Sequence, residues 1–127
     1  MNYKLEHACI RVFDLDKSQK FYEDALGLEV VNKKDFSEYK FTLVYMSDEN
    51  RNFEIELTYN YDTEKPYELG HGFSHFAVVT EDINASFANH EKMGVTCTPI
   101  KSLGEGFATF YFIEDPDGYK IEVIEKK

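Results

Sequence analysis

The sequence predicts an α+β fold made of two consecutive copies of one β-α-β-β-β unit. The first observation is an internal repeat: at an offset of 68 residues, the segment that begins at His7 matches the segment that begins at His75. The second observation is that residues 53–57 match residues 119–123 at an offset of 66. A period of about 67 residues is too long for a solenoid and indicates a duplicated supersecondary unit. We therefore expect one domain over 1–127, with copies at about 4–60 and 72–125.

In the first copy, a strand is expected over 5–13, where apolar residues alternate with polar ones. A helix follows over 17–25, because Asp14 and Asp16 are both N-cap candidates and Gly27 is placed to end the helix. Its apolar side chains recur at three- and four-residue spacing, as in an amphipathic helix. Three strands complete the copy, and they are expected at 28–34, 40–46 and 53–59.

The second copy predicts the same succession of elements. Its first strand is expected over 73–80, and its helix is capped near Asp82 and ends at Gly94. The segment 61–72, which contains a proline and two glycines, is the predicted connector between the copies. A tight turn is predicted at 115–118, where Asp-Pro-Asp-Gly has proline at the second position and glycine at the last. The remaining strands are expected at 95–100, 108–113 and 119–124.

Composition and charge exclude several classes of partner. The chain has 14 Lys+Arg against 24 Asp+Glu, a formal net charge of −10. We therefore expect neither nucleic acid nor an anionic membrane as its partner. No run approaches the roughly 20 apolar residues of a membrane span, and no apolar signal segment opens the chain. Cys9 and Cys97 lie in no CxxC spacing and are interpreted as free thiols. A cytoplasmic protein that binds a small molecule is the expectation.

The alternation of strand residues groups four candidate metal ligands. His7 lies in the first strand of the first copy and Glu56 in its last strand, each on the face opposite the apolar residues. In the second copy, His75 and Glu122 occupy the corresponding places. Two neutral imidazoles and two carboxylates match the charge of a divalent cation and suit a first-row transition metal. The alternative interpretation is structural, with hydrogen-bonded histidines and with glutamates that form the polar half of alternating strands.

Four other side chains are of a type that could have a functional role. Arg11 is expected on the same face as His7, where an inward-facing cation calls for an anion. Cys9 lies between them and is interpreted as a small buried apolar residue. His71, in a glycine-rich loop, and His90, on a helix, are expected to face solvent.

Six sequence blocks carry a resemblance to a known family. They are HACIRVFDL at 7–15, SxxFYxxxLGL at 18–28, EIELTYN at 54–60, YELG at 67–70, SHFA at 74–77 and EDPDGYKIEVIE at 114–125. On these blocks the chain resembles the vicinal oxygen chelate superfamily along nearly its whole length and, within it, the short bacterial type of glyoxalase I. The first and last blocks recur widely in the superfamily, whereas EIELTYN followed by YELG is characteristic of glyoxalase I.

The resemblance implies a fold, an activity and a cofactor. The fold is two βαβββ modules that form an incompletely closed eight-stranded barrel-like sheet. The activity is that of a lactoylglutathione lyase, a homodimer that isomerises the hemithioacetal of methylglyoxal and glutathione to S-lactoylglutathione. The cofactor is a divalent metal. Ni²⁺ is expected, with Co²⁺ as its substitute and Zn²⁺ as the alternative, because the short chain lacks the insertions of zinc-dependent relatives.

The resemblance also implies roles for individual residues. The metal ligands that it implies are His7, Glu56, His75 and Glu122. Of these, Glu122 is the main catalytic base and Glu56 its partner. Arg11 and Asn60 hold the glutathione part of the substrate. Whether the ligands of one site come from one chain or from two is left open.

The chain departs from the family at two places. Ser74 stands where relatives have a glycine before the second metal-binding histidine, a change expected to matter little. The loop before the seventh strand has Glu105 where the family often has a basic residue for a glutathione carboxylate, and only Lys101 is near. This second departure leaves open whether glutathione or another thiol is the cosubstrate.

Three other functions compete on the same fold. A methylmalonyl-CoA epimerase-like enzyme shares the proton chemistry, but usually has Gln at the position of Glu56. An extradiol dioxygenase uses a site of two histidines, one carboxylate and iron, which a fourth protein ligand argues against. A non-enzymatic drug-binding resistance module needs no metal, and the four intact ligand positions argue against that class.

Overall fold

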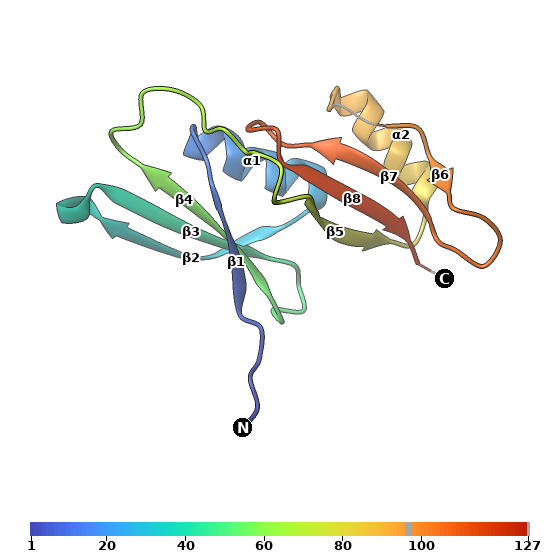
Figure 1. Ribbon diagram of the computed structural model, residues 1–127, viewed down its shortest axis with the longest axis horizontal. Coiled ribbons are helices and arrows are strands. Elements are labelled where there is room, and N and C mark those ends of the chain that lie inside the picture. Colours follow the sequence, from blue (N-terminus) through green and yellow to red (C-terminus); the bar gives the residue numbers. More distant parts are fainter. Residues whose placement is uncertain (96–97, 127) are drawn as a thin grey trace. The chain divides into compact units, whose positions relative to one another are not determined.

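The computed structural model describes residues 1–95 and 98–126, which divide into two units (Figure 1). Unit 1 is Met1–Glu68 and unit 2 is Leu69–Lys127, so the boundary falls within the predicted connector 61–72. Each unit is described below by itself. Over the described residues, no helix has the length and apolar character needed to cross a membrane.

Unit 1 is a four-stranded sheet with one α-helix and a short 3₁₀ turn. The strand order is β1-β4-β3-β2, in which β1 and β4 run parallel and the other neighbours antiparallel. Because β1 and β4 are the first and last strands of the unit, residues far apart in sequence become neighbours. In chain order the elements are β1 (His7–Arg11), α1 (Leu15–Leu26), β2 (Glu29–Phe36), η1 (Ser37–Tyr39), β3 (Phe41–Ser47) and β4 (Glu54–Asn60).

Unit 2 repeats this topology. Its strand order is β5-β8-β7-β6, and its first and last strands, β5 and β8, are again parallel (Figure 1). In chain order the elements are β5 (His75–Thr80), α2 (Ile83–Met93), β6 (Lys101–Ser102), β7 (Thr109–Glu114) and β8 (Lys120–Glu125). The predicted α+β class with two βαβββ modules is confirmed, and among the described residues neither sheet of four closes on itself.

Both helices have the capping residues that the repeat predicts. The side chains of Asp14 and Asp82 accept hydrogen bonds from the backbone N–H groups three residues on, at 3.1 and 3.0 Å. Helix α1 begins two residues earlier than predicted, because Asp14 rather than Asp16 is its N-cap. Gly27 and Gly94 follow the helices with φ of 66° and 76°, a left-handed conformation that glycine adopts without steric cost.

The predicted strand at 95–100 is wrong in the residues that the structure describes. Val95 and residues 98–100 are not in a strand, residues 96 and 97 lie outside the described residues, and the edge strand is the short β6. Thr98 still pairs with Phe112: its N–H donates to the Phe112 carbonyl and its Oγ1 accepts from the Phe112 N–H, both at 2.9 Å. Pro99 then interrupts the ladder, because proline has no N–H to donate. The prediction of a free thiol at Cys97 also lies outside the described residues.

One face of each sheet carries the fully buried side chains, and their burial fixes the direction in which the residues between them point. The fully buried side chains include Tyr22, Val12, Val44 and Leu57 in unit 1 and Tyr111, Ile113, Ile121 and Val123 in unit 2. Leu57 follows Glu56 in β4, and apolar residues flank Glu122 on both sides in β8. Because successive strand residues point to opposite faces, burying these neighbours turns both glutamates to the other face.

The matched N-caps provide a test of the repeat. We expect Asp14→Ala and Asp82→Ala each to lower the free energy of unfolding by about 1 kcal/mol, because each leaves a helical N–H without its side-chain acceptor. Urea unfolding monitored by circular dichroism measures both losses. Asp16→Ala is the control and should cost less, since Asp16 lies inside the first turn; an equal loss at Asp16 would contradict the assignment of Asp14 as the cap.

Candidate active site

In unit 1 the structure brings His7 and Glu56 together. His7 is the first residue of β1, and Cys9, two residues on, is the ladder partner of Glu56 in β4. Strand alternation therefore places His7, Cys9 and Glu56 on one face. The Nε2 atom of His7 lies 3.4 Å from Oε2 of Glu56.

Unit 2 contains the equivalent pair. His75 begins β5, and Ala77, two residues on, is the ladder partner of Glu122 in β8. The Nε2 atom of His75 lies 3.3 Å from Oε1 of Glu122. The four candidate ligands thus form two His–Glu pairs of the same construction, one in each unit.

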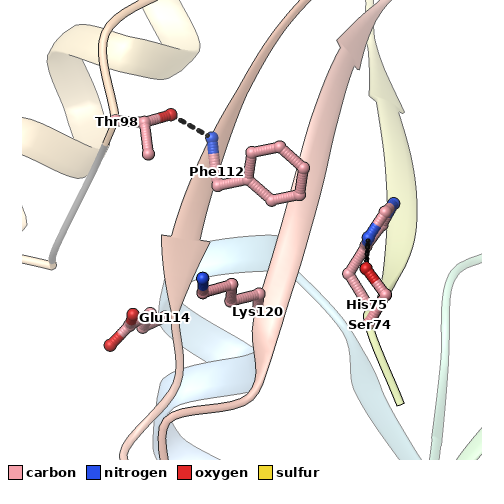
Figure 2. Close-up of a pocket in the computed structure, with 6 residues that line it drawn as sticks. All are labelled: Ser74, His75, Thr98, Phe112, Glu114 and Lys120. Atoms are coloured by element: carbon pink, nitrogen blue, oxygen red, sulfur yellow. Dashed lines mark hydrogen bonds between the residues drawn. The ribbon is translucent and has the colours of Figure 1, made fainter. Parts of the chain in front are cut away.

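The residue before each histidine contacts its other ring nitrogen. Nδ1 of His7 lies 2.9 Å from Oε1 of Glu6, and Nδ1 of His75 lies 2.7 Å from Oγ of Ser74 (Figure 2). A hydrogen bond at one ring nitrogen orients the imidazole and leaves the other available as a ligand. The replacement of glycine by Ser74 was expected to matter little, but its hydroxyl contacts the ring of His75. The sequence feature that could have identified Glu6 and Ser74 is their position directly before a candidate metal ligand in each copy.

An aromatic ring packs edge-on against each histidine. The rings of His7 and Tyr45 lie 5.5 Å apart at 77°, and those of His75 and Phe112 lie 5.0 Å apart at 87°. Tyr45 is the ladder partner of Glu56 in the β3–β4 pairing, and Phe112 is the ladder partner of Glu122 in the β7–β8 pairing. Sequence reasoning missed both aromatic residues, because their role depends on strand pairing.

Glu56 is held by hydrogen bonds. Oγ1 of Thr58 donates to its carboxylate at 3.2 Å, and Sγ of Cys9 lies 3.1 Å from that same Oγ1. Burial by itself raises the pKa of Glu56, but hydrogen bonds from Tyr45, Cys9 and Thr58, together with nearby His7, outweigh it and lower that pKa. The hydrogen bond with Glu56 is the main reason why the pKa of Tyr45 is raised to about 12.

Two interpretations of individual side chains were wrong. Cys9 is exposed rather than a buried apolar residue, since its strand position places it beside the Glu56 carboxylate. His90 is buried, with 2% of its surface exposed, and its Nδ1 lies 2.7 Å from the hydroxyl of Tyr111. The expectation that His90 faces solvent was wrong, because the hydroxyl of Tyr111 in β7 provides a hydrogen-bond partner for its ring in the interior. His71 is exposed, as expected.

The predicted substrate residues lie at the ends of two strands. Arg11 is the last residue of β1 and is exposed, on the same face as His7. Asn60 is the last residue of β4, and its Nδ2 donates to the hydroxyl of Tyr67 at 2.9 Å. The hydroxyl of Thr63 contacts the same Tyr67 oxygen at 3.0 Å, so the loop after β4 is tied to Asn60.

A cavity of about 250 Å³ opens beside His75 in unit 2. Figure 2 shows the Phe112 ring and the Lys120 side chain on neighbouring strands, with Ser74 next to His75. Its wall combines the aromatic ring of Phe112 with polar and charged side chains. The lining residues are Ser74, His75, Thr98, Phe112, Glu114 and Lys120.

The donor atoms of each pair fit part of a metal site. Two ligands bound at about 2.1 Å to one ion lie about 3.0 Å apart in octahedral and about 3.4 Å apart in tetrahedral geometry. The Nε2-to-carboxylate distances of 3.4 and 3.3 Å are close to these values. Within the described residues of either unit, no three His, Cys, Asp or Glu side chains are grouped to hold an ion. Each pair therefore supplies at most two ligands.

Comparison with known proteins identifies relatives of this chain. The model of the Glyoxalase/Bleomycin resistance protein/Dioxygenase superfamily matches residues 4–123. A protein of Synechocystis sp. named probable lactoylglutathione lyase is 44% identical over 124 residues, which cover 95% of this chain and 94% of the relative. The lactoylglutathione lyase of Haemophilus influenzae is 42% identical over 127 residues, with 95% and 91% covered.

Solved structures agree with the sequence relatives. Glyoxalase I from Zea mays superposes with a TM-score of 0.87 at 35% identity, over 97% of this chain and 44% of that longer chain. The trypanothione-dependent glyoxalase I of Leishmania major gives a TM-score of 0.81 at 37% identity, over 98% and 87%. The resemblance to glyoxalase I is thus confirmed, and the chain belongs to the Glyoxalase/Bleomycin resistance protein/Dioxygenase superfamily.

Proposed function

We propose that this protein is a glyoxalase I, a metal-dependent lactoylglutathione lyase that isomerises the hemithioacetal of methylglyoxal and glutathione to S-lactoylglutathione. The observation that carries the proposal is the duplicated His–Glu pair, with donor atoms 3.4 Å apart in unit 1 and 3.3 Å apart in unit 2. The relatives named lactoylglutathione lyase, similar over nearly the whole chain, support the choice of reaction.

The proposed cofactor is a divalent metal ion. Its ligands would be His7, Glu56, His75 and Glu122. The neutral imidazoles and the two carboxylates suit a first-row transition metal, and Ni²⁺ is proposed, with Co²⁺ as substitute and Zn²⁺ as alternative. When bound, the ion would polarise the two adjacent oxygens of the substrate and acidify the C–H bond between them.

The glutamates are proposed to move the proton. Glu122 removes it from the carbon that bears the hydroxyl and the sulfur, and a glutamate returns it to the neighbouring carbonyl carbon. The reaction shifts one hydrogen between adjacent carbons, so no oxidant or reductant is consumed. A carboxylate within reach of the C–H bond is a suitable general base. Glu56 acts as its partner.

The thiol end of the substrate is proposed to bind at Arg11 and Asn60. The guanidinium of Arg11 is exposed on the face that carries the His7–Glu56 pair, where a substrate carboxylate would find a cation. Asn60 is oriented by its hydrogen bond to Tyr67. Glutathione is proposed as the thiol. The enzyme is also proposed to be a cytoplasmic homodimer, as the resemblance to glyoxalase I implies.

Metal dependence is the first test. Treatment with a chelator followed by dialysis should abolish turnover of the hemithioacetal, and Ni²⁺ or Co²⁺ should restore it better than Zn²⁺. The absorbance of the thioester product measures the rate, and metal analysis gives the occupancy. Full activity of the metal-free protein would contradict the proposed function.

The two glutamates are separated by a second test. Glu122→Gln should lower kcat about 10²–10⁴-fold even with metal saturating, because the amide keeps the size of the side chain but is no base. Glu56→Gln should lower kcat less. Both variants are measured at confirmed full metal occupancy, so that weakened metal binding does not enter the comparison. A larger loss at Glu56 would reverse the two roles.

Arg11 is tested through the Michaelis constant. Arg11→Ala should raise KM strongly and change kcat less, because the thiol end is bound similarly in the ground state and the transition state. Arg51→Ala is the matched control, since Arg51 pairs with Glu29 away from the His7–Glu56 pair. If KM is unchanged in Arg11→Ala, Arg11 does not bind the substrate.

A further inference from the structure

The two His–Glu pairs have the same geometry but different surroundings. In unit 1, three polar side chains surround Glu56: Cys9 opposite it in β1, Tyr45 opposite it in β3, and Thr58 two residues further along β4. Oγ1 of Thr58 donates to the carboxylate at 3.2 Å and lies 3.1 Å from Sγ of Cys9. Hydrogen bonding from Tyr45, Cys9 and Thr58 lowers the pKa of Glu56 against the effect of burial.

In unit 2, all three equivalent positions are apolar. Ala77 lies opposite Glu122 in β5, Phe112 lies opposite it in β7, and Ile124 follows two residues along β8. None of these side chains carries a hydrogen-bond donor. The carboxylate of Glu122 lies 3.3 Å from Nε2 of His75. Lys120, two residues before Glu122 on the same face, forms no ion pair with it among the described residues. The side chain of Glu122 is 21% exposed, against 11% for Glu56.

Tyr45 is placed to make the largest difference between the units. Its ring packs edge-on against His7, as Phe112 packs against His75, so the aromatic packing is shared and the hydroxyl is the added group. Burial of Tyr45, with 7% of its surface exposed, restricts the directions in which that hydroxyl can turn. The ring therefore contacts the histidine of the pair, and the hydroxyl is the group that hydrogen-bonds with Glu56.

We propose that Tyr45, assisted by Cys9 and Thr58, is a positioning residue that restrains Glu56 as a fixed metal ligand, whereas Glu122, which has apolar residues at the three equivalent positions, has a carboxylate that is free to turn toward the substrate. This inference rests on the proposed function and explains why two glutamates in equivalent positions divide the roles of ligand and base. A carboxylate held by several donors has few orientations, and a carboxylate among apolar side chains keeps more.

The test compares Tyr45→Phe with a matched control, Tyr61→Phe. Both remove one tyrosine hydroxyl from unit 1, but the hydroxyl of Tyr61 bonds Thr42, on the opposite face of the sheet from Glu56. Cobalt(II) alone is titrated into each metal-free protein, and its visible absorption spectrum is recorded. Tyr45→Phe should weaken cobalt binding about tenfold or more, the usual effect of losing a partner of a ligand, and should shift the spectrum. Tyr61→Phe should do neither.

Two further variants test the division of roles. Phe112→Tyr offers Glu122 the same kind of donor, so kcat should fall while cobalt affinity holds or rises. In the Tyr45→Phe background, Glu122→Gln should cost less in kcat than in the wild type, because Glu56 is then less restrained. A wild-type cobalt affinity and spectrum in Tyr45→Phe would overturn the inference, and so would an unchanged kcat in Phe112→Tyr.

The outcomes separate this inference from the proposed function. If the wild-type protein binds no cobalt, the proposed metal enzyme is wrong. If the wild type binds cobalt and Tyr45→Phe binds it equally well, only the role of Tyr45 is wrong. Circular dichroism and thermal unfolding of the metal-free variants establish that each is folded.

Discussion

The parallel pairing of the first strand of each unit with its last strand is the constraint on which the candidate site depends. It joins β1 to β4 and β5 to β8, segments separated in sequence by a helix and two other strands. In both pairings the histidine stands two residues before the ladder partner of the glutamate. On the other face, Ile55 and Leu57 of β4 and Ile121 and Val123 of β8 are buried, so a one-residue slip of register would expose the core and separate each pair.

Duplication explains why the two pairs are alike, and divergence explains why they are not interchangeable. Glu56 and Glu122 occupy equivalent positions in their sheets, and each has an aromatic residue as its ladder partner in the neighbouring antiparallel strand. The side chains at three equivalent positions differ: they are polar around Glu56 and apolar around Glu122. The proposed mechanism, in which one carboxylate is held and the other is a mobile base, would use this asymmetry.

The fold alone does not specify this chemistry. A domain from Frankia sp. superposes with a TM-score of 0.81 at only 17% identity, which shows a shared fold and nothing more. Glyoxalase activity therefore depends on individual side chains rather than on the fold. Among them are the neighbours of the histidines, Glu6 and Ser74, whose contacts with Nδ1 leave both Nε2 atoms facing a carboxylate.

The sequence by itself determined the repeat, the helix caps, the turn at 115–118 and the faces on which the candidate ligands lie, because these features depend on local propensity and on alternation within one strand. The tertiary structure decided what depends on pairing between distant strands. It placed Tyr45 and Cys9 against Glu56, buried His90 against a tyrosine of β7, and moved the edge strand of unit 2 beyond Pro99. Those outcomes depend on ladder register and on which buried polar groups find partners, and neither is encoded in a single segment of the chain.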